Sequence, residues 1–223
     1  MDTNYSVVIP AFNAGAFLPE AVQSVLGQTM PPLHVIIVDD GSTDNTSEIA
    51  RNLGPKIQLI RTENRGAGPA TTMGVEHVET PVVAFLDADD VWALDKMERQ
   101  LARLVDQSLN TDAVVGKMTS FGATHLKDSD QESSGWHRST LTIWTEKFRL
   151  VGAVEQMPNG YGEMVDWFSR AREHGIRFHL PAESIAMRRI HENSLSFCGG
   201  IGRDSDYLRT AIRALMRKKL LKQ

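Results

Sequence analysis

The segment Pro81-Val82-Val83-Ala84-Phe85-Leu86-Asp87-Ala88-Asp89-Asp90 decides the fold class, because an apolar run ends abruptly in three carboxylates. Residues 82–86 have the length and the uninterrupted apolar character of a strand that is buried on both faces. Such strands are typical of parallel sheets covered by helices, in which ligands bind beyond the carboxyl ends of the strands. The segment therefore predicts a binding site around Asp87, Asp89 and Asp90, at the end of a central strand.

Strand and helix patterns alternate along the rest of the chain. We expect further strands at 6–10, 34–38, 57–60, 113–116 and 141–144, and helices at 17–26, 43–53, 67–78, 95–105, 163–174 and 203–222. Parallel strands need long crossover connections, and helices between the strands supply them. The chain is therefore predicted to have an α/β fold, in which a mostly parallel sheet carries helices on both faces.

The composition excludes several classes of protein. A chain of 223 residues with 41% hydrophobic and 23% charged residues is ordinary for one globular domain with its own core. The single cysteine, Cys198, rules out an internal disulfide framework and a zinc site built from thiolates. The formal net charge of −4 argues against a general affinity for nucleic acid. No apolar run reaches the roughly 20 residues of a membrane span, and the N-terminus lacks the basic start of a signal peptide, so we expect a cytoplasmic protein.

The carboxylates of the acidic loop need a partner, because neighbouring like charges repel one another. Hard divalent cations such as Mg²⁺ and Mn²⁺ prefer oxygen ligands and often bridge carboxylates to substrate phosphates. A simpler interpretation is that Asp side chains start the following helix by accepting hydrogen bonds from its free amides. We expect Asp90 to take this capping role, and Asp87 and Asp89 to serve a metal ion and a phosphate group.

Together with two other strand ends, the acidic loop resembles the inverting family 2 nucleotide-sugar glycosyltransferases of the GT-A fold. The matching segments are Ser6-Val7-Val8-Ile9-Pro10-Ala11-Phe12-Asn13, Val38-Asp39-Asp40-Gly41-Ser42-Thr43-Asp44 and Phe85-Leu86-Asp87-Ala88-Asp89-Asp90-Val91-Trp92. The resemblance is close over 6–104 and looser beyond. It implies a GT-A glycosyltransferase domain at 1–200, followed by a basic C-terminal helix at 201–223. Within the domain, 1–110 would bind the nucleotide sugar and 111–200 the acceptor.

The resemblance implies which residues bind the nucleotide. Pro10, Ala11 and Asn13 would lie under it, with backbone groups close to the base. Asp39 would bind the base or the ribose, and Asp40 would support the loop that carries Asp39. A plain turn is the other interpretation of these aspartates, since the sequence Asp-Gly-Ser favours turns in any protein.

The resemblance also implies a metal site at the Asp-x-Asp pair. Asp89 would ligate Mg²⁺ or Mn²⁺, and Asp87 would bind the ribose or assist the metal, with Ala88 in the same donor-binding loop. His191 lies in a segment that resembles the family's Arg-Ile-His, and a neutral imidazole there would complete the metal shell. The other interpretation of His191 is a structural histidine.

Two departures from the family pattern leave roles open. Thr71-Thr72 stand where the family often has Arg-Asn, so Arg65 would replace a missing nucleotide contact. Met164 stands where the family usually has the Asp that accepts the proton of the acceptor hydroxyl. Asp166 and Glu163 remain as candidates for this catalytic base, although carboxylates in a first helical turn also favour the helix dipole without any catalytic role.

The resemblance implies transfer of a sugar, by expectation from a UDP-sugar, with help from the divalent cation. The acceptor is not specified and could be a glycan, a lipid-linked molecule, a peptide or a small molecule. Trp136 is a candidate contact with the acceptor, and the other interpretation is a core residue. The basic C-terminal helix either touches an anionic membrane or presents a solvated face, and a homodimer is a further option. We also expect a mobile loop at 127–135 and a flap over bound donor at 196–202.

Two other functions remain as alternatives. A protein that has lost its base would bind a nucleotide sugar without transferring it. The loop at 85–91 also resembles the nucleophile loop of haloacid-dehalogenase-type phosphatases, but those enzymes carry this loop near the start of the domain and need a later acidic pair.

Overall fold

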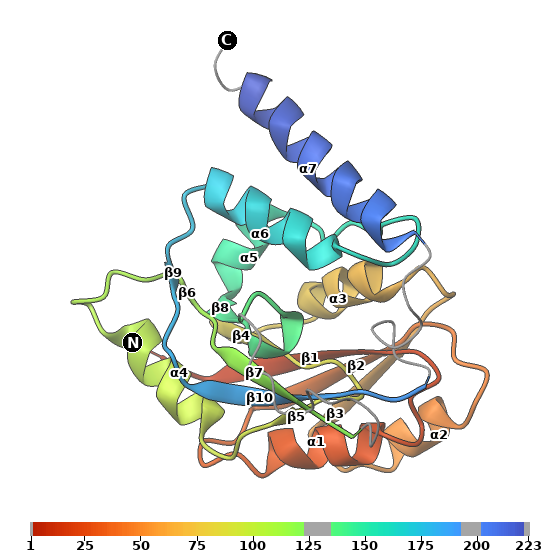
Figure 1. Ribbon diagram of the computed structural model, residues 1–223. Helices are drawn as coiled ribbons and strands as arrows, with labels where there is room; N and C mark the ends of the chain where they lie inside the picture. Colours follow the sequence, from red (N-terminus) through yellow and green to blue (C-terminus); the bar gives the residue numbers. More distant parts are fainter. Residues whose placement is uncertain (1, 123–134, 193–201, 221–223) are drawn as a thin grey trace.

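The computed structural model describes residues 2–122, 135–192 and 202–220, without the side chains of Lys218 and Leu220. In this part of the chain the larger of two sheets is built from seven strands, namely β1 (Tyr5–Ala11), β2 (His34–Asp39), β3 (Ile57–Arg61), β4 (Val82–Phe85), β6 (Ala113–Val114), β8 (Thr142–Trp144) and β9 (Phe178–His179). Their order across the sheet is β3-β2-β1-β4-β8-β6-β9 (Figure 1). Neighbouring strands run parallel except where β8 pairs with β4 and with β6, which confirms the predicted mostly parallel sheet.

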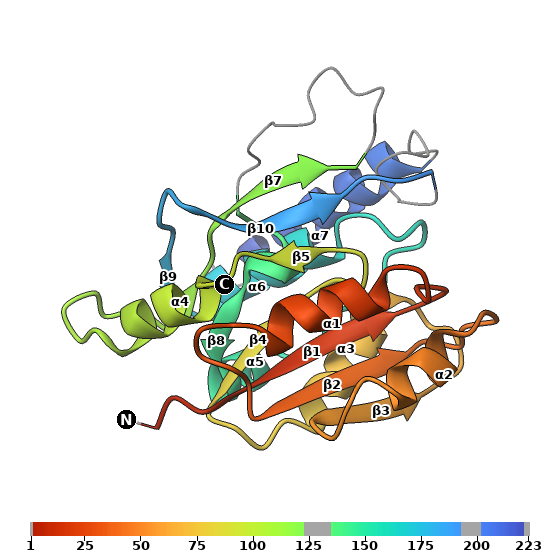
Figure 2. The same ribbon diagram turned by 90° about the horizontal axis from the view of Figure 1, so that it is seen from below.

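Helices cover both faces of this sheet (Figures 1 and 2). One face carries α1 (Leu18–Leu26), α2 (Thr46–Arg51) and α4 (Lys96–Val105), and the other carries α3 (Ala67–Glu76), α5 (Thr145–Val151) and α6 (Glu163–Glu173). Successive residues of β1 alternate between two apolar cores, with Val7 and Ile9 in one and Val8 in the other. A strand buried in this way needs apolar residues on both sides, which explains its uninterrupted apolar sequence.

A second, smaller sheet lies beside the acidic loop, and the sequence analysis did not predict it. Its strands are β5 (Val91–Trp92), β7 (Lys117–Phe121) and β10 (Ser184–Arg189), in the order β5-β10-β7 (Figure 2). β5 directly follows Asp90, and β10 leads into the segment that contains His191. Because β5 and β10 pair, the small sheet brings His191 next to the acidic loop.

The last described helix, α7 (Arg203–Leu220), packs against α6 and projects from the body of the molecule (Figure 1). The predicted halves 1–110 and 111–200 share one sheet, because β6, β8 and β9 extend the order begun by the first four strands. The predicted loop and flap lie almost wholly outside the described residues, as does Cys198. Among the helices that the structure describes, none is both long enough and apolar enough to cross a membrane.

Candidate active site

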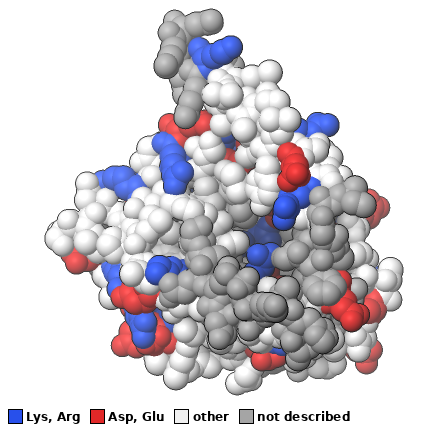
Figure 3. Space-filling view, in the orientation of Figure 1, with Lys and Arg blue, Asp and Glu red and all other residues white. Residues whose placement is uncertain are grey.

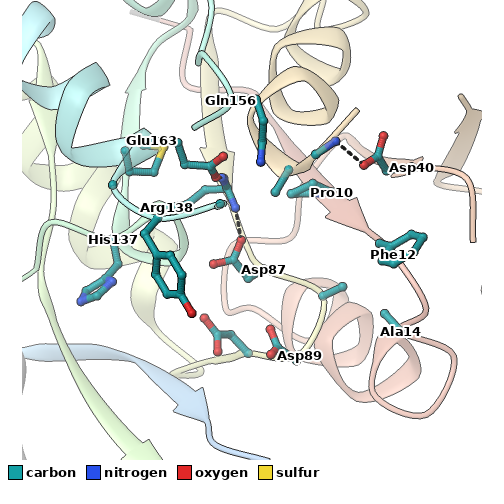
Figure 4. A pocket seen from close by; sticks show the side chains of 18 of the residues that line it. Pro10, Phe12, Ala14, Asp40, Asp87, Asp89, His137, Arg138, Gln156 and Glu163 are labelled. Atoms are coloured by element: carbon teal, nitrogen blue, oxygen red, sulfur yellow. Dashed lines mark hydrogen bonds and ion pairs between the residues drawn. The ribbon is translucent and has the colours of Figure 1, made fainter. Parts of the chain in front are cut away.

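A cleft of about 1040 Å³ opens at the carboxyl ends of β1, β2 and β4 (Figure 4). The lining residues that matter for the argument are Pro10, Asn13, Asp40, Asp87, Ala88, Asp89, Arg138, Glu163 and His191. The parallel strands end at one edge of the sheet, so the turns that follow them come together there. The three strand-end loops that the sequence analysis singled out therefore meet in one cleft.

The cleft contains an arginine that the sequence analysis missed. Arg138 begins the 3₁₀ turn η1 (Arg138–Thr140), is 6% exposed, and pairs with the carboxylates of Asp87 and Glu163 (Figure 4). Burial would lower the pKa of Arg138, but the two carboxylates raise it overall, so the guanidinium stays charged. Arg138 thus joins the acidic loop to the start of α6. No motif at 136–140 points to this role, because it depends on two carboxylates that are distant in the sequence.

His191 lies against the acidic loop. Its Nε2 is 3.1 Å from Oδ2 of Asp89, and its ring centroid is 4.4 Å from that of Phe17. Burial and the neighbouring carboxylate of Asp87 raise the pKa of Asp89, so a cation at this position would relieve an electrostatic cost.

The donor set around Asp89 fits a divalent metal that is shared with a substrate. Among the side chains that the structure describes, no three His, Cys, Asp or Glu residues gather into a complete metal site. Mg²⁺ is usually bound by one or two protein groups together with substrate phosphates, and Mn²⁺ accepts the same oxygen ligands. Asp89 and His191 match such a partial set, with phosphate oxygens supplying the other ligands.

Asp90 has a structural role, and its predicted role as a helix cap is wrong. Helix α4 begins at Lys96 and is preceded by Asp95. The buried carboxylate of Asp90 accepts hydrogen bonds from Oγ of Ser139 at 2.6 Å and from the backbone amide of Arg189 at 3.2 Å. Burial also raises the pKa of Asp90 well above its ordinary value. Asp90 therefore fastens the acidic loop to η1 and to β10.

Of the two aspartates at the end of β2, Asp40 lines the cleft and Asp39, the predicted nucleotide contact, does not. Asp40 lines the cleft and accepts hydrogen bonds from the backbone amides of residues 65–66. Asp39 is fully buried outside the cleft, where its carboxylate accepts hydrogen bonds from the amide of Ser42 and the hydroxyl of Ser47. Burial opposes ionisation there, but the bonds from Ser42 and Ser47 lower the pKa of Asp39 overall. Successive residues of an extended strand point in opposite directions, so only one of the two faces the cleft.

Some of the other predicted donor-binding residues line the cleft, and others lie outside it. Those that line the cleft are Pro10, Asn13, Asp87 and Ala88. Asn13 adopts a positive φ of 48°, and its Oδ1 accepts a hydrogen bond from the amide of Thr43 at 2.8 Å, which links the first two loops. Ala11 packs in the apolar core instead. Arg65 lines a neighbouring cavity of about 340 Å³, which shares Asp40 with the cleft.

The two candidates for the catalytic base lie in different places. Glu163 lines the cleft, and burial raises its pKa although the Arg138 guanidinium opposes the shift. Asp166 is buried outside the cleft, with its carboxylate bound to Arg170 at 2.9 Å and to Arg217 of α7 at 3.0 Å. The structure therefore does not support Asp166 as the base, because its side chain fastens α7 to α6 and is not among the residues that line the cleft.

Trp136 lines the cleft but belongs largely to the core. Its ring makes edge contacts with Phe168 and Phe178, and the guanidinium of Arg172 lies over it, 4.1 Å from the ring centroid. These contacts favour the interpretation of Trp136 as a partly buried core residue. Met164 also lines the cleft, next to Glu163.

The fold and the cleft are those expected of a GT-A type glycosyltransferase. The sequence profile of the family described as "Glycosyl transferase family 2" matches residues 6–178, and the chain belongs to this family. TuaG of Bacillus subtilis (strain 168), whose name describes a glycosyltransferase of teichuronic acid biosynthesis, is 39% identical over a match of 206 residues, and the match covers 86% of this chain and 81% of TuaG.

Two solved structures have a similar fold. TarS of S. aureus in complex with UDP-GlcNAc aligns with a TM-score of 0.69 at 19% identity, over 86% of this chain and 60% of that chain. The mannosyltransferase PcManGT from Pyrobaculum calidifontis, in complex with GDP-Man and Mn²⁺, aligns with a TM-score of 0.73 at 19% identity, over 96% of this chain and 64% of that chain. The chain thus spans less than two thirds of either structure, and at this identity the likeness shows the fold alone.

Proposed function

We propose that the protein transfers a sugar from a nucleotide diphosphate sugar to a hydroxyl group, with inversion at the anomeric carbon and with a divalent cation. The observation that carries the proposal is the convergence of Asp40, Asp89, His191 and Glu163 on one cleft. These side chains provide acceptors for a nucleobase, ligands for a cation and an acceptor for a proton. The cleft volume of about 1040 Å³ is at the upper end of ordinary ligand sites, which leaves room for a donor and an acceptor together.

The nucleoside end of the donor is proposed to bind beside Asp40 and Asn13. Two backbone amides fix the Asp40 carboxylate, so it is held in place for an N–H group of a base. Asn13 holds the first two loops together from within the same cleft. UDP-sugars are the proposed donors, as in the TarS complex with UDP, and GDP-sugars, as in the PcManGT complex with GDP-Man, are the alternative.

The diphosphate end is proposed to bind beside Asp89 and His191, which would hold Mg²⁺ or Mn²⁺ with it. A divalent cation at this position stabilises the negative charge that gathers on the nucleotide diphosphate as the glycosidic bond breaks. Packing against Phe17 restricts the orientation of the imidazole, so that Nε2 stays directed at the acidic loop. The PcManGT complex with Mn²⁺ supports this choice of metal.

Glu163 is the proposed base that removes the proton from the acceptor hydroxyl. Burial raises its pKa, and a base works best when its pKa is near the working pH. Arg138 holds the Glu163 carboxylate in position and counteracts the loss of its charge. Because Arg138 also binds Asp87, it fixes the distance between the base and the donor-binding loop.

One observation favours a second function, binding of a nucleotide sugar without transfer. Met164 stands where the family usually has its base, and Glu163 is already paired with Arg138. The phosphatase alternative is withdrawn, because the chain belongs to glycosyl transferase family 2. For the acceptor we propose a glycan, in line with the name of TuaG as a glycosyltransferase of teichuronic acid biosynthesis. A cytoplasmic location and a homodimer stay predictions.

The experiment is to measure release of nucleoside diphosphate from a panel of UDP-sugars and GDP-sugars, with and without Mn²⁺. We expect metal-dependent release with a UDP-sugar. Glu163→Gln should keep donor affinity and lose turnover, whereas the matched control Glu63→Gln, whose side chain is 92% exposed, should behave as the wild type. Metal-dependent binding without turnover for every donor and acceptor would favour the binding protein. No binding of any nucleotide sugar would overturn both functions.

A further inference from the structure

Helix α7 docks onto the body of the molecule through polar residues. The Asp206 carboxylate is buried and accepts a hydrogen bond from the backbone amide of Asn159 at 2.9 Å. Arg213 donates to Glu155 at 2.8 Å. The docked side of the helix consists of Asp206, Thr210, Arg213 and Arg217, which recur at helical spacing.

The exposed side of α7 is apolar. Leu208 and Leu215 are each 62% exposed, and Ile212 and Met216 are exposed as well. Their spacing of four, three and one residues places them in one stripe along the helix. A surface helix normally buries its apolar stripe against the core and turns its polar side outward. α7 has the opposite arrangement, so the apolar stripe is not explained by packing within the described part of the chain.

Positive charge accompanies this stripe. The helix contains six Lys and Arg residues against two Asp, a net charge of +4, in a chain whose formal net charge is −4. Both aspartates lie in the first turn, so the charge is most positive toward the end of the helix. Arg209 and Lys219 are exposed. Figure 3 shows basic atoms at the outer end of the projecting helix, next to uncharged surface.

We propose that α7 binds an anionic lipid bilayer, lying in its surface with Leu208, Ile212, Leu215 and Met216 inserted and with the exposed Arg209 and Lys219 at the phosphate groups. A helix with an apolar stripe, a basic polar side and low mean hydropathy is suited to the membrane surface and not to spanning the membrane. Each Lys or Arg near an anionic surface adds to the attraction. α7 projects from the body (Figure 1), and the four apolar side chains of this stripe are exposed in the described part of the chain.

Charge argues against a second copy of the chain as the occupant of this stripe. In a symmetric dimer the same surface of each copy faces the other, so the exposed Arg209 and Lys219 of one copy would lie close to those of the other. Like charges opposed across an interface are unfavourable. An anionic bilayer instead offers opposite charge to the same residues.

The position of α7 connects membrane binding to the cleft. Arg203 and Tyr207, in its first turns, line the cleft together with Asn159 and Tyr161. A bilayer under α7 would therefore lie close to the cleft entrance, where an acceptor carried by a lipid could reach it. This last step rests on the proposed transferase function, but binding of the helix to the membrane does not.

The test is flotation of the purified full chain with vesicles, without any nucleotide sugar. Vesicles contain equal parts phosphatidylglycerol and phosphatidylcholine, or phosphatidylcholine alone. We expect binding to the anionic vesicles only, weakened by high salt. Leu208→Glu combined with Leu215→Glu should reduce the partition coefficient at least tenfold. Leu94→Glu combined with Leu150→Glu, at side chains that are 65% and 58% exposed on the body, is the matched control and should leave it unchanged.

A second variant tests the role of charge. Arg209→Gln combined with Lys219→Gln should lower the partition coefficient on anionic vesicles roughly 30-fold, since each basic residue contributes about 1 kcal/mol. Absence of binding by the wild-type chain, or equal binding by the Leu208 and Leu215 variant, would overturn the proposal. Analytical ultracentrifugation tests whether a second copy of the chain binds the stripe instead. If the wild type is a dimer that the Leu208 and Leu215 variant disrupts, and does not bind vesicles, the stripe is an interface between copies and the proposal is overturned. Because these measurements need no catalysis, their failure is distinguishable from failure of the proposed transferase function.

Discussion

Replacing Arg138 with methionine removes the one charge that joins the proposed base to the donor-binding loop. The substitution leaves the buried carboxylate of Glu163 without its charged partner, and it also removes the ion pair of Asp87. Breaking a buried ion pair by removing one partner costs about 3–5 kcal/mol. We expect about 3 kcal/mol, at the lower end, because the side chain of Asp87 is 36% exposed and solvent screens its charge. Urea unfolding measures this loss of stability.

The loss should depend on pH. Burial raises the pKa of Glu163, and Arg138 is the first of the groups that oppose this shift, so its removal raises the pKa further. A carboxyl group whose pKa is higher in the folded state binds a proton on folding, and its protein loses stability as the pH rises through that pKa. The difference in unfolding free energy between wild type and Arg138→Met should therefore be larger at pH 8 than at pH 5.

Two further variants control this experiment. Adding Glu163→Gln to Arg138→Met should recover part of the stability, because the amide carries no charge that needs a partner. Arg103→Met, which removes the ion pair with the more exposed Glu183, should cost at most about 1 kcal/mol. A loss below about 1 kcal/mol for Arg138→Met, equal at both pH values, would refute the reasoning, since a buried charge network would then be absent.

Three other substitutions give separate tests. Asp89→Asn should abolish Mn²⁺-dependent donor binding in calorimetry and leave the melting temperature nearly unchanged; unaltered affinity would remove Asp89 from the metal site. Asp166→Asn should cost about 1–3 kcal/mol in unfolding, since Arg217 loses a charged partner, with kcat close to wild type; lost turnover at full stability would restore it as the base. Gly74→Ala should lower the free energy of unfolding by about 1–3 kcal/mol, because the new Cβ would lie 2.4 Å from Cγ1 of Val8. An increase in the free energy of unfolding, measured in urea, would show that β1 shifts to make room for the methyl group.

The main sheet follows from the sequence because its strands are buried on both faces. The apolar runs at 34–38 and 82–86 predict strands that are covered on both faces, and the helices between the strands predict parallel pairing. The small sheet could not be predicted in this way. β5 has only two residues, and β10 mixes apolar and basic side chains, so neither segment shows the apolar–polar alternation that predicts a strand.

The sequence predicts where the site lies, but it does not predict which side chains contact one another there. The strand-end rule identifies the loops that carry Asp40 and Asp89, but it does not say which of two adjacent aspartates points inward. Arg138 carries no local signal, because its partners are defined only by the folded chain. Asp166 is a candidate base only because it lies close to Met164 in the segment that resembles the family's, and its partner Arg217 lies on a helix whose docking the sequence does not specify.

A crystal structure of the protein with UDP and Mn²⁺ tests the central claim most directly. We expect anomalous density for Mn²⁺ at coordination distance from Asp89 and His191, with the diphosphate on the same ion and uracil beside Asp40. Mn²⁺ bound at other residues, or UDP outside the cleft at the ends of β1, β2 and β4, would contradict the account.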